Sequence, residues 1–232
     1  TSLLLLATIV AAVGLAASWT RRRLRGRRHL RAPLLELLGT FQVCACTNEL
    51  ALLAEPRAAL TLTYGLAVLH GWTLAGCSCN PCGSLQLLRA RPAAAAAAVA
   101  AQFAAAALAR AAMSLVWSLG MAEPHLAALA RGCGNPMQTT EAQAFCIELL
   151  FSVVFQLTIL RVESLNPKYK VHLIALLITV LVYAGGNLTG AVFNPALALS
   201  LHPNCFYDKF WSYSLVYWVA PSLGKSFTLH QV

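Results

Sequence analysis

The stretch "LTGAVFNPA" at residues 188–196 has a counterpart earlier in the chain, "LAGCSCNPC" at residues 74–82. Both contain an Asn-Pro pair, and each pair opens a short apolar segment, residues 80–88 and 194–201. Proline suits the first position of a helix because it has no N–H to lose there, and asparagine caps the turn before it. The two stretches therefore predict two helix N-termini in a chain built from related halves.

A second duplicated element precedes each Asn-Pro pair. "ELLGTFQ" starts at Glu36 and "ELLFSVVFQ" starts at Glu148, 44 and 46 residues before Asn80 and Asn194. A carboxylate inside an apolar helix marks a functional or structural site. We expect each glutamate to accept hydrogen bonds from the re-entrant loop of its own half, whose backbone N–H groups need partners within the protein. An ordinary interfacial charge at a helix end is the alternative.

The composition predicts a membrane protein. The chain is 59% apolar and only 11% charged, whereas a soluble domain carries about 25% charged residues. A helix needs roughly 20 apolar residues to cross a bilayer, and seven hydrophobic stretches approach that length: residues 2–19, 33–53, 60–77, 93–119, 142–161, 171–186 and 210–224. The first reads as an anchor or extra span rather than a cleaved leader. The last gives only about 22 Å of helix, so we expect a truncated or altered final span.

Positive charge is concentrated in one run. The net charge is +9, and seven of the 17 basic residues lie in "RRRLRGRRHLR" at residues 21–31, between two hydrophobic stretches. Such a run is typical of a cytoplasmic connection that orients a membrane protein. We expect no nucleic-acid binding, because no basic surface interleaved with aromatic residues accompanies the run.

The order of the parts predicts an inverted repeat. We divide the chain into a hydrophobic segment with the basic run (1–32), a first repeat (33–119) and a second repeat (140–232). Each repeat has three spans, so the second lies upside down relative to the first, and such repeats place their site near the midplane where half-helices meet. The positive ends of the two half-helices repel protons and cations, while the amides of Asn80 and Asn194 can donate to a passing oxygen. The expected device is a pore for small uncharged hydroxylated solutes.

These motifs, with "YWVAPSLG" at residues 217–224, resemble the aquaporin family over most of residues 33–224. A first box reading NPC beside an ordinary NPA is similar to the unorthodox superaquaporin subfamily; the residues are Asn80, Pro81, Cys82, Asn194, Pro195 and Ala196. The resemblance implies an all-α membrane protein with an aquaporin-like right-handed bundle of six transmembrane helices and two re-entrant half-helices. It implies a multi-pass homotetramer in the endoplasmic reticulum membrane, with other intracellular membranes or the plasma membrane as alternatives. Water, glycerol and hydrogen peroxide are the implied permeants, and no cofactor is implied.

The resemblance also locates a selectivity constriction, and its residues depart from the water-selective pattern. The corresponding positions are Leu60, Val182, Ala191 and Leu197, and Leu197 stands where water-selective members have an arginine. Without a cation or histidine, we expect a wide, weakly polar constriction that discriminates poorly against glycerol and peroxide. Arg110 either supplies a replacement charge or extends along its helix toward the luminal interface.

The cysteines are expected to tune this site rather than to bind metal. Cys77, Cys79 and Cys82 have C-x-C-x-x-C spacing, but the nearest histidine, His70, lies two helical turns away, so we expect no metal site. A small buried thiol packs as alanine does. Cys82 also lies beside a helix start, which favours a reactive thiol that gates the pore. For Cys205 we expect a bridging or tuning role at subunit contacts.

Two classes of function remain open. No nucleophile with its base, phosphate loop or dinucleotide fingerprint is present, so we expect no enzyme. The first class is a channel. The second is a non-conducting membrane scaffold or redox-sensing protein on the same fold, since a fold does not guarantee its activity.

Overall fold

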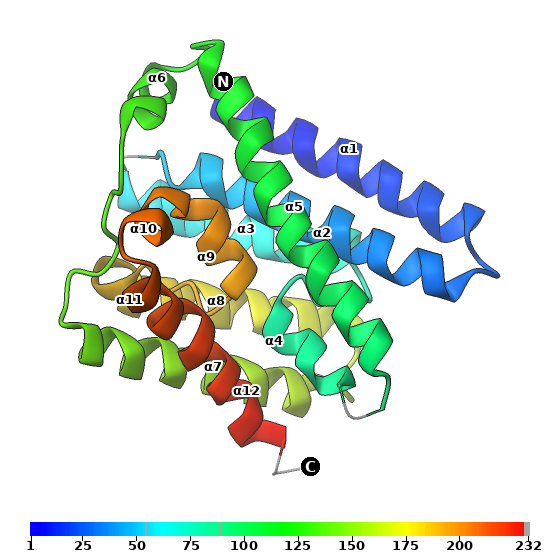
Figure 1. Cartoon of the computed structure of the whole chain (residues 1–232). Helices are drawn as coiled ribbons and strands as arrows, with labels where there is room; N and C mark the ends of the chain where they lie inside the picture. The colour runs from blue at the N-terminus through cyan, green and yellow to red at the C-terminus, as the bar shows by residue number, and fades with distance from the viewer. Residues whose placement is uncertain (54, 89, 230–232) are drawn as a thin grey trace.

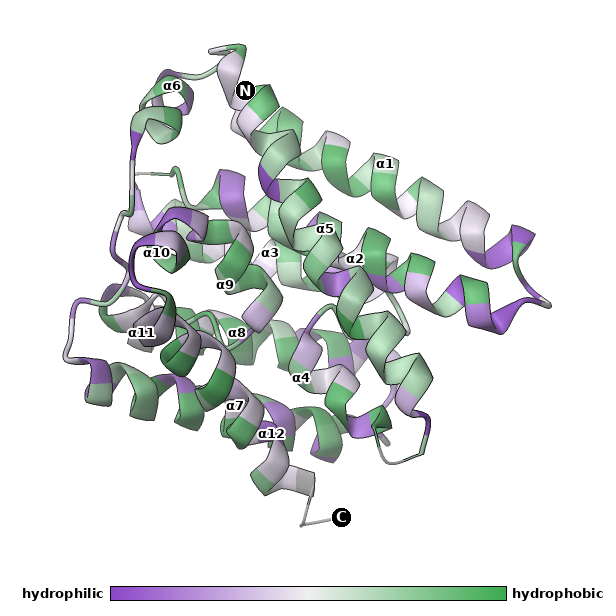
Figure 2. Cartoon of the chain, viewed as in Figure 1, coloured by the Kyte–Doolittle hydropathy of each residue, from purple (hydrophilic) through white to green (hydrophobic). Residues whose placement is uncertain are grey.

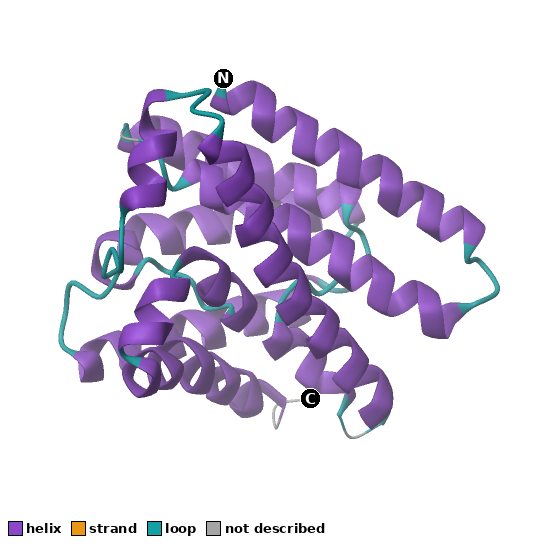
Figure 3. Ribbon diagram, turned by 45° about the horizontal axis from the view of Figure 1, so that its top comes forward, coloured by secondary structure: helices purple, strands orange, loops and turns teal. Residues whose placement is uncertain are grey.

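The structure is a computed structural model that describes residues 1–53, 55–88 and 90–229. Every regular element in this part of the chain is helical (Figure 3). The helices are α1 (Ser2–Arg23), α2 (Arg28–Leu50), α3 (Pro56–Thr73), α4 (Pro81–Ser84), α5 (Pro92–Ser118), α6 (Glu123–Ala130), α7 (Glu141–Val162), α8 (Pro167–Thr189), α9 (Pro195–Leu201), α10 (Pro203–Asp208), α11 (Phe210–Ser214) and α12 (Ala220–Leu229). A 3₁₀ turn, Leu85–Leu87, prolongs α4, and a π-helical segment, Leu215–Val219, joins α11 to α12.

The long helices form a bundle around the two short helices that follow the Asn-Pro pairs (Figure 1). By length and composition, four of the described helices could cross a membrane: α1, α5, α7 and α8. α2 packs against α5 and α1, α3 packs against α8, and α7 packs against α12. The short α9 lies against α5 and α2, and α4 lies against α5 and α12. Half-helices packed inside a ring of longer helices are what the duplicated motif predicts.

The second hydrophobic stretch begins earlier than expected. α2 starts at Arg28 rather than near residue 33 and contains Pro33 in its second turn. A short turn, Leu24–Arg27, joins it to α1, so the basic run spans the end of one helix, the turn and the start of the next. The arginines therefore gather at one end of a helical hairpin.

The last span is longer than expected. The prediction that it ends near Gly224 is wrong, because α11, the π-helical segment and α12 run without interruption from Phe210 to Leu229. At 1.5 Å per residue this helix reaches about 30 Å, a full bilayer core. Its polar end is accommodated inside the protein: Lys225 is only 2% exposed and its Nζ donates to Gln86 Oε1 at 3.2 Å.

Close approach of α7 and α12 requires Gly224. A Cβ at this position would lie 2.8 Å from Ser152 Cβ and 3.0 Å from the Leu149 carbonyl oxygen. Ser152 in turn donates from Oγ to the Pro221 carbonyl at 2.7 Å. The absent side chain and this hydrogen bond hold the last helix against the helix that carries Glu148.

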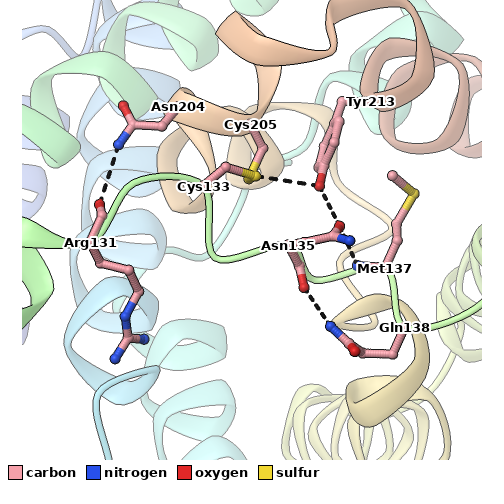
Figure 4. Close-up of a disulfide and its surroundings, with 8 residues drawn as sticks. All are labelled: Arg131, Cys133, Asn135, Met137, Gln138, Asn204, Cys205 and Tyr213. Carbon is pink, nitrogen blue, oxygen red and sulfur yellow. Dashed lines mark hydrogen bonds between the residues drawn. A yellow bond between two sulfur atoms is a disulfide. The ribbon is translucent and has the colours of Figure 1, made fainter.

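A disulfide joins Cys133, in the connection between α6 and α7, to Cys205 in α10 (Figure 4). Nearby, the Tyr213 hydroxyl donates to Asn135 Oδ1 at 2.5 Å, so the connection is held at a second point. A cysteine oxidised within its own chain cannot bridge subunits. The expectation that Cys205 bridges subunits is therefore wrong, and its tuning of subunit contacts stays a prediction.

Candidate functional site

The two Asn-Pro pairs begin two helices in the same way. Pro81 is the first residue of α4, and Asn80 Oδ1 accepts from the Cys82 N–H at 2.9 Å. Pro195 is the first residue of α9, and Asn194 Oδ1 accepts from the N–H groups of Ala196 and Leu197, at 3.1 and 3.3 Å. Each side-chain oxygen thus caps a helix. The nitrogen of each carboxamide is left to bond elsewhere.

Each of these nitrogens reaches across to the opposite loop. Asn80 Nδ2 donates to the Phe193 carbonyl at 3.1 Å, and Asn194 Nδ2 donates to the Cys79 carbonyl at 2.9 Å. Cys79 and Phe193 immediately precede the asparagines, and both have positive φ, 53° and 32°. Side-chain-bearing residues adopt this left-handed conformation at a cost, and such residues cluster at functional sites. A carboxamide has two N–H donors, and the cross-loop bond uses one of them.

The two glutamates bind the loops at equivalent positions. Glu36 accepts from the N–H groups of Ser78 and Cys79, at 2.7 and 3.0 Å. Glu148 accepts from the N–H groups of Val192 and Phe193, at 3.1 and 2.6 Å. These are the two residues before the asparagine in each half. Hydrogen bonds to a carboxylate are roughly twice as strong as neutral ones, so each glutamate holds its loop in the conformation that presents the asparagine.

Several polar residues that complete this centre were not predicted from the sequence. Gln102 Nε2 donates to Glu36 Oε2 at 2.8 Å and to Ser84 Oγ at 3.0 Å. In the other half, Thr189 Oγ1 donates to Glu148 at 2.6 Å, and the Tyr217 hydroxyl donates to the Thr189 carbonyl at 2.6 Å. Gln102 could have been found as the lone polar residue in the alanine-rich stretch "AAQFAAAA".

Comparison with known proteins agrees with this architecture. The Major intrinsic protein family matches residues 86–228. The chain is 44% identical to Aquaporin-11 of Homo sapiens over 97% of this chain and 85% of that protein. It belongs to the aquaporin family.

More distant relatives place the chain within this family of membrane channels for water and small solutes. It is 31% identical to Aquaporin-12 of Mus musculus, over 84% of this chain and 72% of that protein, so its relatives are the superaquaporins. The fold is similar to that of the aquaglyceroporin from Plasmodium falciparum, with a TM-score of 0.69 and 18% identity over 85% of this chain and 92% of that one. The expected aquaporin fold, with an all-helical membrane bundle, is confirmed.

The expected constriction residues of this aquaporin lie in different surroundings. Val182 and Ala191 belong to one apolar cluster, formed by residues of α7, α8 and the loop before α9. Leu197 packs against two other clusters, and Leu60 belongs to none of the clusters formed by the described residues. Their joint role as a filter stays a prediction.

Arg110 lies within the bundle. Its Nη1 donates to Asn48 Oδ1 at 3.2 Å, and its guanidinium carbon lies 5.2 Å from the ring centroid of Trp117. Asn48 Nδ2 donates onward to Ser200 Oγ in α9 at 2.9 Å. The side chain thus reaches toward the Trp117 end of α5, and its charge contacts Asn48 of α2. Its role as a replacement charge or as an extension toward the luminal interface stays a prediction.

The cysteines near the first box are packed closely. Cys82 is fully buried, and its Sγ lies 3.9 Å from Ser222 Oγ in α12. A Cβ added to Gly39 would lie 2.7 Å from Cys79 Sγ, so this thiol fills space against a glycine. Among the residues that the structure describes, no three His, Cys, Asp or Glu side chains are placed to hold a metal ion. Burial of Cys82 disfavours the redox role, which stays a prediction.

Proposed function

We propose that this aquaporin conducts water, glycerol and hydrogen peroxide through a pore that passes between Asn80 and Asn194. The observation that carries the proposal is the cross-loop pairing of the two carboxamides, which brings the starts of both half-helices together. Each amide keeps a second N–H for the oxygen of a permeant. A water that accepts from two fixed donors cannot relay a proton between its neighbours, and neither amide attracts cations.

The two half-helices contribute unequally to the exclusion of cations. α4 is a single turn of four residues followed by a 3₁₀ turn, whereas α9 has seven residues. The partial charge at a helix terminus comes from the unpaired N–H groups of aligned peptides. We therefore assign cation exclusion chiefly to the start of α9 and to the two carboxamides.

For selectivity, we propose that the apolar residues Leu60, Val182, Ala191 and Leu197 form a constriction that admits glycerol and peroxide as well as water. The chemistry of the four side chains supports this assignment, because none carries a charge that would bind water and narrow the passage. We also propose a homotetramer and no catalytic activity, as the family resemblance implies.

We propose the endoplasmic reticulum membrane as the location. The basic hairpin between α1 and α2 and the Cys133–Cys205 disulfide lie at opposite ends of the bundle (Figure 1). A basic connection stays in the cytoplasm, and a disulfide persists in an oxidising compartment such as the endoplasmic reticulum lumen. The two markers support one orientation in that membrane.

The test is stopped-flow flux of water, glycerol and peroxide into proteoliposomes. The variant carries Asn80→Asp and Asn194→Asp, which keep the capping oxygens but replace both cross-loop donors with acceptors. Asn166→Asp is a matched control, because Asn166 also precedes a proline and caps a helix, accepting from the Lys168 N–H at 3.0 Å, but is exposed.

We expect flux above that of empty vesicles for the parent and the control, and flux that is lost or cation-leaky for the double variant. Flux equal to that of empty vesicles, with the parent inserted and folded, would refute the channel and favour a non-conducting scaffold. Equal flux in all three proteins would refute the assignment to the two carboxamides.

A further inference from the structure

In the part of the chain that the structure describes, the arginines at the α1–α2 hairpin form no ion pair with a carboxylate. Seven of them lie in residues 21–31, and Figure 2 shows hydrophilic residues concentrated at this end of α1 and α2. Within residues 1–53, 55–88 and 90–229, the ion pairs are Lys170 with Glu163 and His125 with Glu49, neither of which includes these arginines. Like charges held together on a short hairpin repel one another, so this end of the protein favours an anion.

Five of the seven arginines line an open cavity of about 500 Å³. The charged residues that line it are Arg21, Arg22, Arg25, Arg28, Arg31 and Glu36. The rest of the wall comes from α2 and from the loop that follows α3. An orienting signal for membrane insertion needs only the positive charge. It does not require that guanidinium groups from two helices line a common cavity.

The wall is partly preorganised. Arg21 donates to the Thr73 carbonyl from Nη1 and Nη2, at 3.2 and 3.3 Å, and from Nη2 to the Ala75 carbonyl at 3.0 Å. Arg31 Nη1 donates to the Arg25 carbonyl at 3.3 Å, across the hairpin turn. These bonds fix two half-buried arginine side chains that line the cavity. A ligand would therefore lose less conformational freedom on binding than it would at a flexible basic tail.

Glu36 does not neutralise this wall by ion pairing. Both of its oxygens accept hydrogen bonds from the first loop and from Gln102. Five arginines and one glutamate give a formal charge of 5 − 1 = +4 around the cavity. Two phosphate monoesters carry about −3 to −4 at neutral pH, and a phosphodiester adds about −1. The cavity thus matches a headgroup that carries two phosphate monoesters and a diester.

We propose that this cavity binds the headgroup of a bisphosphorylated inositol phospholipid from the cytoplasmic leaflet. Arginine suits this role because its planar guanidinium donates in pairs to phosphate oxygens. The cavity lies where two apolar helices end in basic residues, which is the depth of lipid headgroups. The cavity shares Glu36 and the loop before Asn80 with the proposed pore. Its test measures ligand binding and does not depend on conduction.

The test uses two variants that remove equal charge from the same run. Arg25→Gln with Arg28→Gln changes arginines that line the cavity, and Arg23→Gln with Arg27→Gln changes arginines that do not. Binding to each purified protein in detergent is measured by microscale thermophoresis, with dioctanoyl phosphatidylinositol 4,5-bisphosphate, dioctanoyl phosphatidylserine and soluble inositol 1,4,5-trisphosphate as probes. Monodisperse elution and an unchanged melting temperature establish folding. If either double variant does not fold, Arg25→Gln and Arg23→Gln make the same comparison.

We expect the bisphosphate lipid to bind the parent more tightly than the other two probes. The lining variant should weaken that binding about tenfold or more, because it removes two charge-assisted contacts, and the control should change it less than about threefold. Equal weakening of lipid binding by both variants would show only a diffuse electrostatic attraction to the basic run. It would overturn the proposal of a specific site in the cavity. Binding of phosphatidylserine with equal affinity would overturn the bisphosphate assignment. Binding of inositol trisphosphate as tight as the lipid would assign the site to a soluble polyphosphate and overturn the lipid.

Discussion

Replacing Glu148 by glutamine tests the bracing of the second loop with little change in shape. Glu148 is fully buried, and its Oε1 accepts from Thr189 Oγ1 and the Val192 N–H while its Oε2 accepts from the Phe193 N–H. Glutamine keeps one oxygen but presents an NH₂ group in place of the other. In the better of its two orientations, it retains two neutral hydrogen bonds and sets the NH₂ against the N–H of Phe193.

The expected loss of stability in Glu148→Gln follows from these three hydrogen bonds. Changing a charge-assisted bond to a neutral one loses about 1 kcal/mol, and a buried donor left without a partner costs about 1–3 kcal/mol. Two weakened bonds and one unpaired N–H therefore reduce the free energy of unfolding by about 3–5 kcal/mol. For a chain of this size, that corresponds to a melting temperature lower by roughly 6–20 °C.

The assay is thermal unfolding in detergent, followed by intrinsic fluorescence, with glycerol flux as a second measurement. Glu163→Gln is the matched control, because Glu163 directly follows α7, its side chain is 70% exposed, and it pairs with Lys170 near the start of α8. An exposed pair contributes less than about 1 kcal/mol. Equal melting temperatures for the two variants, with equal flux, would refute the conclusion that the carboxylate holds the loop.

Three further predictions concern the packing and charge of other regions. Cys133→Ser removes the disulfide and should lower the free energy of unfolding by about 2–5 kcal/mol. Cys146→Ser, which changes an exposed free thiol, should leave it unchanged. Thermal unfolding without reductant compares the two variants. Gly224→Ala should lower the free energy of unfolding by about 1–3 kcal/mol, because its Cβ would lie 2.8 Å from a side chain of α7. Gly65→Ala is the control, because nothing lies within 4 Å of a Cβ there, and it should lower the free energy of unfolding less in the same assay. Burial, aided by the charge of a nearby arginine, lowers the pKa of His202 from 6.5 to about 4. The unfolded chain therefore binds an extra proton between these values, so stability is full above pH 6.5 and falls by up to about 1.4 kcal/mol per unit as pH decreases toward 4. His202→Gln should flatten that acid slope, and an unchanged slope would refute the assignment.

The duplicated motif predicted the centre of the fold because its chemistry is local. Asn-Pro followed by apolar residues favours a capped helix start whatever surrounds it, and α4 and α9 begin at Pro81 and Pro195. A buried glutamate near a loop has few acceptable partners other than backbone N–H groups. The positions of Glu36 and Glu148 before each pair were therefore informative from the sequence alone.

Other features depend on contacts between distant segments. The last helix continues past Gly224 because Lys225 donates a hydrogen bond to Gln86, 139 residues earlier. Without that partner, the polar end of the helix would not be buried. The disulfide partner of Cys205 lies 72 residues away and has no local signal. Composition could identify the basic run but not its cavity, because the cavity requires the tight α1–α2 turn and the loop after α3.

The contacts also determine how the two halves are oriented. The loop before α4 lies at the basic end, since the Ala75 carbonyl accepts from Arg21. α9 ends at the opposite, disulfide-linked end, since α10 follows it directly and contains Cys205. Yet the starts of α4 and α9 meet, because Asn80 and Asn194 each bond to the opposite loop. The half-helices thus enter from opposite ends and point toward each other, the inverted arrangement that an odd number of spans in each half requires.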